Sequence, residues 1–465
     1  MAFDISLIQE SSAKGIILKS ITIIGIISTI FSLFSPNPLL CVPAFVSLYF
    51  IVYNLYVSKY LAGFLVAFVY QWFQVSIKIL YACYTFQDVQ NLTQYPDHIL
   101  KCYLLCSLGL IIITYAISTF IKRAKFNDQT IFNLINKFNL NRLLISYFMI
   151  GIIAHMLPLS LSQLTIQLAA FKWGIFYIIF LLFYNKERGK WIILALVSFE
   201  FVLGFASYFS SWKDVVFYTL ISVLTVIKLT PKRIFILGLA SVALFYIGLL
   251  WTGIKGEYRT YIAQGSTQAM MVSKADAINK IFDLGSNFKV NDNVTKSFID
   301  RISYIDYLSA CMNHVPNIVP HENGKLTINA ITHVLIPRVV NKNKAVIDES
   351  THLTKYTGVF FSNLSMGVSF SLGYFGDFYV DFGEIGMLIA ILCMGFFIGW
   401  IFLNVYNHIQ NPIIGIAVMQ MSFILLYKFE ISLIKLVGTI VTFWILYRLL
   451  AAYIFPKYSK WIMNE

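Results

Sequence analysis

The sequence is short of charge. Charged residues make up 12% of its 465 residues, whereas hydrophobic residues make up 58% and the mean hydropathy is +0.74. A soluble domain usually carries about 25% charged residues, so this composition excludes an ordinary soluble globular protein. It indicates a chain that lives in a lipid bilayer, where every charge costs free energy unless it is paired, hydrated or bound.

The sequence also lacks the motifs of several common chemistries. It has no P-loop, no GxGxxG, no GxSxG, no HExxH, and no Asp-x-Asp pair of the kind that holds a metal on a nucleotide sugar. Its seven histidines are not paired at metal-ligand spacing, and its six cysteines form no disulfide or metal pattern. We therefore expect neither a metal nor a cofactor.

Long apolar segments are what the sequence does have. A helix rising 1.5 Å per residue needs about 20 apolar residues to cross the hydrocarbon layer. The sequence thus predicts an all-α polytopic membrane protein with about twelve transmembrane helices. The segments lie near residues 16–34, 38–57, 60–84, 99–121, 143–161, 166–184, 191–209, 214–229, 234–253, 384–406, 411–427 and 431–454.

Basic residues alternate between successive connections of these segments. With the N-terminus inside, the cytoplasmic connections hold Lys59; Lys122, Arg123, Lys125, Lys137 and Arg142; Lys186, Arg188 and Lys190; Lys232 and Arg233; and Lys457 and Lys460. The opposite connections at 87–97 and 158–169 hold no Lys or Arg. The positive-inside rule accounts for the net charge of +13 without a nucleic-acid partner, and it predicts that both termini are cytoplasmic.

One polar insert interrupts the apolar pattern. We expect an N-terminal membrane bundle of about nine helices over residues 1–253, a large outward-facing loop over 254–365, and about three C-terminal membrane helices over 366–465. A soluble loop set between membrane helices is the natural place for chemistry, because charged groups stay hydrated there.

The outward loop carries cations that suit an anionic ligand. Arg259 follows the ninth predicted segment, and Arg301, Arg338 and Lys344 lie further along. The planar fork of arginine matches phosphate oxygens, and lysine adds a point charge. Simple solvation is the alternative, favoured for Lys274, Lys280, Lys289 and Lys296, and snorkelling is the alternative for Arg259. Arg338 directly follows the apolar residues 335–337, which favours a place against apolar surface.

A second cluster is acidic. In GYFGDFYVDFGEIG, Asp377 and Asp381 are four residues apart and would share one face of a helix. A carboxylate among aromatic neighbours can have its pKa raised and act as a general base. Helix capping beside an interfacial aromatic belt is the alternative, and it is the favoured interpretation for Glu384.

Two lysines carry charge into predicted spans. Lys78 and Lys435 both fall in the outer half under this topology, so they could face the same cavity as the loop. Snorkelling, or pairing with Glu430, is the competing interpretation.

These elements together resemble a known family. Ile336-Pro337-Arg338, then Lys344, then Gly376-Asp377-Phe378-Tyr379-Val380-Asp381-Phe382-Gly383 opening an apolar span, resemble the Wzy-type O-antigen polymerases of bacterial surfaces. The large outward loop late in a chain of about twelve spans is similar as well. Asn341 and Lys342 depart from the family pattern, which often has Trp-Pro there, and Ala345 stands where the family usually has Pro.

The resemblance implies a metal-independent glycosyltransferase of the integral-membrane (GT-C-like) type. It would polymerise undecaprenyl-diphosphate-linked oligosaccharide repeat units at the periplasmic face of the inner membrane, with membrane lipids and a chain-length regulator as further partners. The catalytic residues it implies are Arg338 on the donor diphosphate and Asp377 or His333 as the base. The implied substrate-binding residues are Arg259, Arg301, Lys344, Lys78, Lys435 and Tyr379.

Three other classes of protein stay open. An O-antigen ligase would use the same kind of donor and differ only in its acceptor, a lipid A-core. A flippase for the lipid-linked unit would more often show even loops and basic residues within its spans. A non-catalytic scaffold would not need an arginine flanked by apolar residues beside the membrane.

Overall fold

The computed structural model describes residues 2–157, 162–184, 189–205, 212–265, 270–336, 347–361 and 369–463, and their regular structure is entirely helical. In chain order the main helices are α1 (Ala2–Ser32), α2 (Cys41–Leu55), α3 (Ala62–Tyr84), α4 (Pro96–Ile121), α5 (Asp128–Ile135), α6 (Leu140–Met156), α7 (Ser162–Tyr184), α8 (Gly189–Phe205), α9 (Trp212–Val226), α10 (Pro231–Ala263), α11 (Lys274–Ser286), α12 (Asp292–Ile302), α13 (Ile305–His314), α14 (Lys325–Leu335), α15 (Glu349–Thr357), α16 (Tyr374–His408), α17 (Pro412–Gln420), α18 (Ser422–Leu426), α19 (Leu433–Leu449) and α20 (Phe455–Met463). Short helical turns at Lys59–Leu61, Val89–Leu92 and Leu450–Ile454 complete the set.

Seven helical stretches in the described part of the chain are long and apolar enough to cross a membrane. They are Ser12–Ser32, Lys59–Tyr84, Pro96–Ile121, Gln163–Tyr184, Pro231–Ala263, Tyr374–His408 and Leu433–Met463, and the stretches Cys41–Leu55, Leu140–Ala154 and Pro412–Leu426 are apolar but shorter. The all-helical class is thereby confirmed, and the apolar helices indicate a membrane-embedded protein. A count of about twelve spans stays a prediction.

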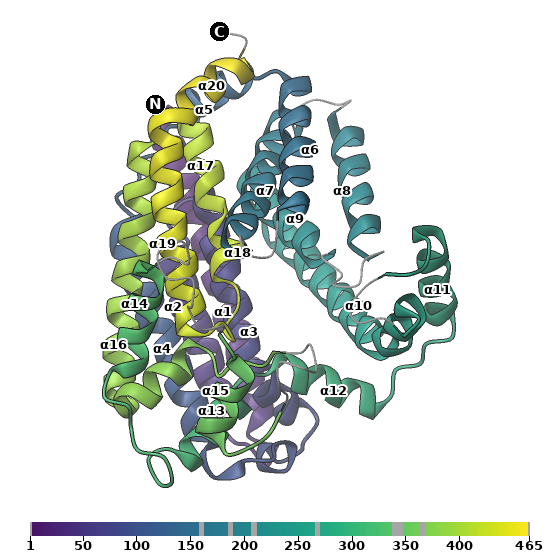
Figure 1. Ribbon diagram of the computed structural model, residues 1–465, viewed down its shortest axis with the longest axis vertical. Coiled ribbons are helices and arrows are strands. Elements are labelled where there is room, and N and C mark those ends of the chain that lie inside the picture. The colour runs from purple at the N-terminus through teal and green to yellow at the C-terminus, as the bar shows by residue number, and fades with distance from the viewer. Residues whose placement is uncertain are drawn as a thin grey trace.

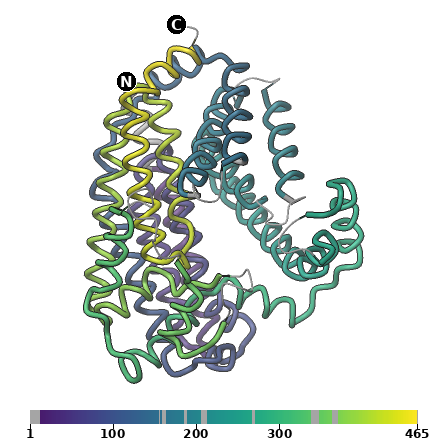
Figure 2. The backbone as a smooth tube through the Cα atoms, viewed as in Figure 1, coloured from purple at the N-terminus to yellow at the C-terminus, as the bar shows by residue number. Residues whose placement is uncertain are grey.

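The helices form two groups. Figure 1 shows α1, α2, α3, α4, α16 and α19 side by side along the long axis, with α6 to α9 as a second group beside them. Helix α10 leans away from both groups. The sequence predicted that this helix ends at residue 253, but it continues to Ala263. The tube in Figure 2 follows the chain from α10 through α11 and back along α12 to the first group.

Small residues allow a close contact between α4 and α16. A Cβ atom on Gly395 would lie 2.8 Å from the carbonyl oxygen of Ile113, and one on Gly399 would lie 2.9 Å from that of Ile117. The two glycines are four residues apart on one face of α16, the spacing by which membrane helices bring their backbones together. Larger side chains at either position would push α16 away from α4.

Helix α16 is bent near its start. Gly383 has φ +69° and ψ −168°, a conformation open to glycine but strained for residues with a Cβ atom. The bend separates a short buried helix that contains Asp377 and Asp381 from the long apolar stretch that follows. Phe382-Gly383 of the sequence motif therefore marks a change of direction.

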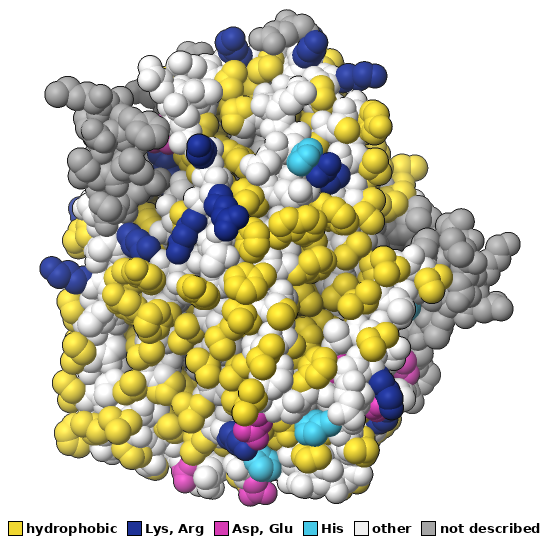
Figure 3. Space-filling model, turned by 90° about the vertical axis from the view of Figure 1, so that its left-hand side faces the viewer, with side chains coloured by type: hydrophobic (Ala, Val, Ile, Leu, Met, Phe, Trp, Pro, Cys, Tyr) yellow, Lys and Arg dark blue, Asp and Glu magenta, His cyan; other side chains and the backbone are white. Residues whose placement is uncertain are grey.

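The two ends of the molecule differ in charge. Figure 1 places both termini at one end, here called the termini end, and α12, α13 and α15 toward the other, here called the loop end. Figure 3 shows a broad hydrophobic band between them, with Lys and Arg toward the termini end and a mixture of acidic, basic and His side chains at the loop end. This band is the surface expected of a protein whose flank faces lipid.

Candidate functional site

A partly buried ion pair joins α15 to the start of α16 at the loop end. The Nε2 atom of His352 lies 2.9 Å from Oδ1 of Asp377, and the other carboxylate oxygen accepts a hydrogen bond of 2.8 Å from the backbone N–H of Leu433. The Asp377 side chain is 5% exposed and that of His352 is 29% exposed. Asp377 is thus fixed by two neighbours, and the histidine is the member of the pair that reaches solvent.

The Asp377 contact sets the chemistry of His352. Burial disfavours its charged form, but the hydrogen bond and negative charge of Asp377 outweigh burial, so the pKa of His352 is raised. When Nε2–H donates to the carboxylate, Nδ1 is the nitrogen that can accept a proton. A histidine oriented in this way by a buried carboxylate is suited to general-base catalysis.

Glu349 forms a second polar contact between α15 and α19. Its carboxylate accepts hydrogen bonds from Ser432 and from Ser369, the latter at 3.0 Å, and it pairs with Lys435. The Glu349 side chain is 7% exposed, whereas that of Lys435 is 42% exposed. Lys435, predicted to bind substrate, therefore has a buried carboxylate as its partner and still reaches the surface.

Two further carboxylates hold α14 and α15 in place. Asp381 accepts hydrogen bonds from Leu326 N–H (3.0 Å), Thr327 N–H (2.7 Å) and the Thr327 hydroxyl (2.6 Å), which caps α14. Glu322 accepts from Lys355 Nζ (2.7 Å) and the Tyr356 hydroxyl (2.8 Å) on α15, and the bond from Lys355 is the main reason that its pKa falls to about 2. The acidic residues of this region fix the insert onto the bundle.

Four cations, here called the cation group, lie beside this region, with Lys255 within electrostatic range of the other three. They are Lys213 at the start of α9, Lys255 and Arg259 on α10, and Arg301 on α12. Lys255 experiences the positive charge of the other three. Arg301 is solvent-exposed, yet partial desolvation and the charge of Arg259 lower its pKa. Like charges held together by three helices favour an anion among them.

One short stretch of chain connects the cation group with the His352–Asp377 pair. Glu430 lies close enough to act electrostatically on Lys213, and it accepts a 2.7 Å hydrogen bond from Gln74 Nε2. Leu433, three residues later, donates to Asp377. The two clusters are thus neighbours at the loop end, on either side of residues 430–433.

The remaining predicted site residues have structural contacts. Lys78 is almost fully buried, and its Nζ lies 2.8 Å from Asp300, 2.6 Å from Asp306 and 3.2 Å from the carbonyl oxygen of Leu92. Tyr379 is 4% exposed and donates from its hydroxyl to the carbonyl oxygen of Val315 at 2.9 Å. The contacts of Lys78 anchor α12 and α13 to α3, and those of Tyr379 pin the chain that follows α13.

Only some of the predicted residues in and near the Ile-Pro-Arg segment are among the described residues. His333 lies half-buried in the last turn of α14. Arg338 and Lys344 lie outside the described residues, so their predicted roles rest on the sequence. Arg259 and Arg301 are brought together, and Asp377 meets His352, a histidine to which the sequence analysis gave no role.

The sequence interpretation missed Lys213, Glu349 and the role of His352. The Trp-Lys-Asp start of α9 did carry a signal, since Lys213 and Asp214 are charges at the edge of an apolar segment. His352 and Glu349 are three residues apart on α15, a spacing that puts both on one helix face. Their partners come from distant parts of the chain and leave no local pattern.

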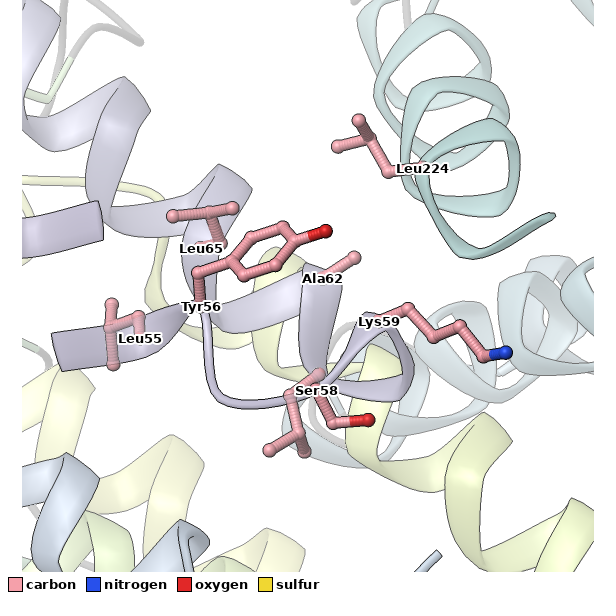
Figure 4. A pocket seen from close by; sticks show the side chains of 8 residues that line it. Leu55, Tyr56, Ser58, Lys59, Ala62, Leu65 and Leu224 are labelled. Atoms are coloured by element: carbon pink, nitrogen blue, oxygen red, sulfur yellow. The ribbon is translucent and has the colours of Figure 1, made fainter. Parts of the chain in front are cut away.

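A small cavity lies elsewhere, toward the termini end. Residues that join α2 to α3, among them Tyr56 and Ala62, face Leu224 of α9 across it (Figure 4). Lys59, on its edge, pairs with Asp128 of α5 at 2.6 Å. Within the described residues no group of three or more His, Cys, Asp or Glu side chains is placed to hold a metal ion.

The arrangement defines a class: an all-helical protein whose apolar bundle carries a polar cluster of cations, carboxylates and one oriented histidine at its loop end. The family model described as "Domain of unknown function (DUF8712)" matches residues 46–461, and the chain belongs to that family. No curated protein and no solved structure matches the chain.

Proposed function

We propose that this protein polymerises glycan repeat units carried on a lipid diphosphate. The nearness of Lys213, Arg259 and Arg301 to Lys255 is the observation that carries the proposal. A diphosphate leaving group carries its own activation, so the reaction needs cations to stabilise the developing charge and needs no nucleotide site. The resemblance of Gly376–Gly383 to the Wzy-type polymerases supports the same assignment.

In the proposed reaction the bond between the anomeric carbon of the donor glycan and its diphosphate breaks. The same carbon forms a bond to a hydroxyl oxygen of the acceptor repeat unit. The hydroxyl proton passes to Nδ1 of His352, which Asp377 holds in place through Nε2. The lipid diphosphate leaves with the bonding electron pair, stabilised by the cation group and by Arg338 from the sequence motif. Undecaprenyl diphosphate is the proposed carrier, on both the donor and the acceptor.

The proposal extends to topology and partners. Both termini would lie in the cytoplasm, and the loop end would face the periplasm across a bacterial inner membrane, with about twelve spans in a GT-C-like arrangement. The charge difference between the two ends in Figure 3 supports this orientation. Membrane lipids and a chain-length regulator would be its partners, besides the donor and acceptor.

A cell-based test uses Arg338→Ala in a strain that depends on this protein for surface glycan. We expect the lipid A-core to carry a single repeat unit instead of a ladder, because export and ligation still work. Arg338→Lys should restore little, since an ammonium cannot reproduce the arginine fork. Bare core would assign the protein to the ligase or flippase class, and a normal ladder would remove Arg338 from the mechanism.

A reconstituted test separates polymerase from ligase directly. The purified protein in vesicles should elongate a synthetic lipid-diphosphate repeat unit with no lipid A-core present. His352→Gln should lower the rate, while Lys289→Ala, which changes an exposed loop cation, should leave it unchanged. Transfer that occurs only when lipid A-core is added would overturn the polymerase assignment in favour of a ligase.

A further inference from the structure

Helix α14 belongs to the polar insert, yet it lies along the bundle. Figure 1 shows it beside α16 and α19, and it packs against both. Its first turn is held by Asp381, and near its last turn Val334 Cγ2 lies 3.6 Å from where a Cβ atom on Gly438 would be. Gly438 comes five residues after Leu433, at which α19 begins, and at 1.5 Å per residue this is about 7.5 Å further toward the middle of the bundle.

The charged residues where α15 meets α19, here called the charged layer, lie nearer the loop end than Gly438. Lys435, which pairs with Glu349, precedes Gly438 by about one helical turn, and the residues after it, 436–446 (LVGTIVTFWIL), carry no charge. Helix α14 thus starts beside carboxylates at the loop end. It extends along α19 past Lys435, the last charged residue near that end of α19. A helix that follows this course lies beside the uncharged part of α19, which belongs to a candidate membrane span.

Apolar side chains lie on both sides of α14, and on the outer side they stand beside the exposed Asn329 and Thr332. Leu326, Ala330 and Val334 pack toward the protein, and Ala330 is buried. On the opposite face Ile328, Ile331 and Leu335 are 60%, 45% and 69% exposed. These three residues follow the i, i+3, i+7 spacing of a continuous stripe along a helix. The exposed hydroxyl of Thr332 donates to the carbonyl oxygen of Ile328 at 2.9 Å, so it is satisfied within the helix.

A neighbouring helix of the same insert shows the opposite pattern. The exposed face of α12 carries Asp292, Asn293, Lys296, Ser297 and Asp300. A helix whose outer face meets water is expected to be polar there, as α12 is. The difference between the two helices therefore reflects different surroundings and not the general composition of the insert.

The exposed stripe of α14 continues onto a candidate membrane span. Phe382, Ile385 and Ile389 of α16 are 41%, 78% and 58% exposed, and a Cβ atom on Gly324 would lie 3.3 Å from Phe382. Lys325, the charged residue of α14, is exposed at the end near the charged layer, from which its ammonium can reach the headgroups. We propose that the stripe of Ile328, Ile331 and Leu335 lies in the lipid hydrocarbon of the leaflet at the loop end, so that α14 is a membrane-inserted helix of the insert.

Fluorescence quenching in vesicles tests the proposal. Single cysteines at Ile331→Cys and Leu335→Cys, in a Cys393→Ser background that removes the exposed native thiol, carry an environment-sensitive fluorophore. Ile318→Cys is the matched control, because Ile318 is 70% exposed in the same insert but outside α14. The vesicles contain phosphatidylcholine and phosphatidylglycerol, with or without lipids bearing a nitroxide on the acyl chain.

We expect the nitroxide lipid to quench the label at 331 and 335 several-fold more than at 318, and aqueous iodide to show the reverse order. Iodide quenching at 331 and 335 as strong as at 318 would place the stripe in water and overturn the proposal. Protection from both quenchers would also overturn it, because a second copy of the chain would then cover the stripe. None of these readouts depends on glycan polymerisation, so their outcome is independent of the proposed function.

Discussion

His352 and Asp377 are 25 residues apart in sequence, and their side chains meet at 2.9 Å between Nε2 and Oδ1. The contact joins a helix of the insert to the first turn of the helix that opens the C-terminal membrane part. Leu433 holds the second oxygen of Asp377 from a third helix, α19. One carboxylate therefore links three segments and orients the histidine that we propose as the base.

This pair makes stability depend on pH. The net effect of Asp377 raises the pKa of His352, so its charged form stabilises the fold fully below the ordinary histidine pKa of about 6.5. That contribution is lost as the pH rises through the raised value. We expect the unfolding temperature of the wild type to fall as the pH rises through this interval, and that of His352→Gln to fall less.

The comparison isolates His352 from its charged neighbours. Lys355 and Glu349 on its own helix and Lys435 on α19 remain in both proteins, so their titration affects both curves alike. Thermal unfolding of the purified protein in detergent, recorded across the pH range, is the measurement. Parallel curves for the two proteins would mean that the pair contributes no pH-dependent stability.

Removing one member of the cation group should slow transfer. Arg301→Ala should lower the rate of repeat-unit transfer in vesicles by roughly 10²-fold, the scale of losing one donor to a developing charge. Lys296→Ala is the matched control, since Lys296 is an exposed cation on the same helix but outside the group. Equal rates for the two variants would show that Arg301 contributes no more to transfer than an exposed cation elsewhere on α12.

Lys78 should matter for stability. Removing one partner of a buried ion pair leaves the other charge unpaired, at a cost of about 3–5 kcal/mol, and we expect the lower end because Asp300 is 43% exposed. Lys78→Met should therefore lower the free energy of unfolding, and adding Asp306→Asn should recover part of the loss. If Lys78→Met unfolds like the wild type but no longer binds the lipid-diphosphate donor, the lysine is a ligand-binding residue as the sequence predicted.

The topology has a direct test. A reporter fused after Asn291 should behave as periplasmic and one fused after Asp128 as cytoplasmic, because basic residues alternate between the connections. The first position lies at the start of α12 and the second at the start of α5, on opposite ends of the molecule. Reversal of either reporter would move every proposed site residue to the wrong side of the membrane.

Local patterns predicted part of this site, and long-range contacts supplied the rest. The spacing of Asp377 and Asp381 predicted a shared helix, and both lie in α16. Their partners differ, because α14 approaches one carboxylate and α15 with α19 approaches the other. Glu430, predicted as an alternative partner of the span lysines, accepts a hydrogen bond from Gln74 instead. Such pairings depend on how the helices cross, which no short window of sequence records.

The bend at Gly383 has a mechanical consequence. A membrane-crossing helix tilts when the bilayer around it becomes thicker or thinner. In α16 the long apolar segment leaves the acidic helix at Gly383, whereas the acidic helix is tied to Leu433 and to the first turn of α14. We therefore expect tilting of the long segment to change the backbone at the glycine, and the geometry around Asp377 to vary little with the thickness of the membrane.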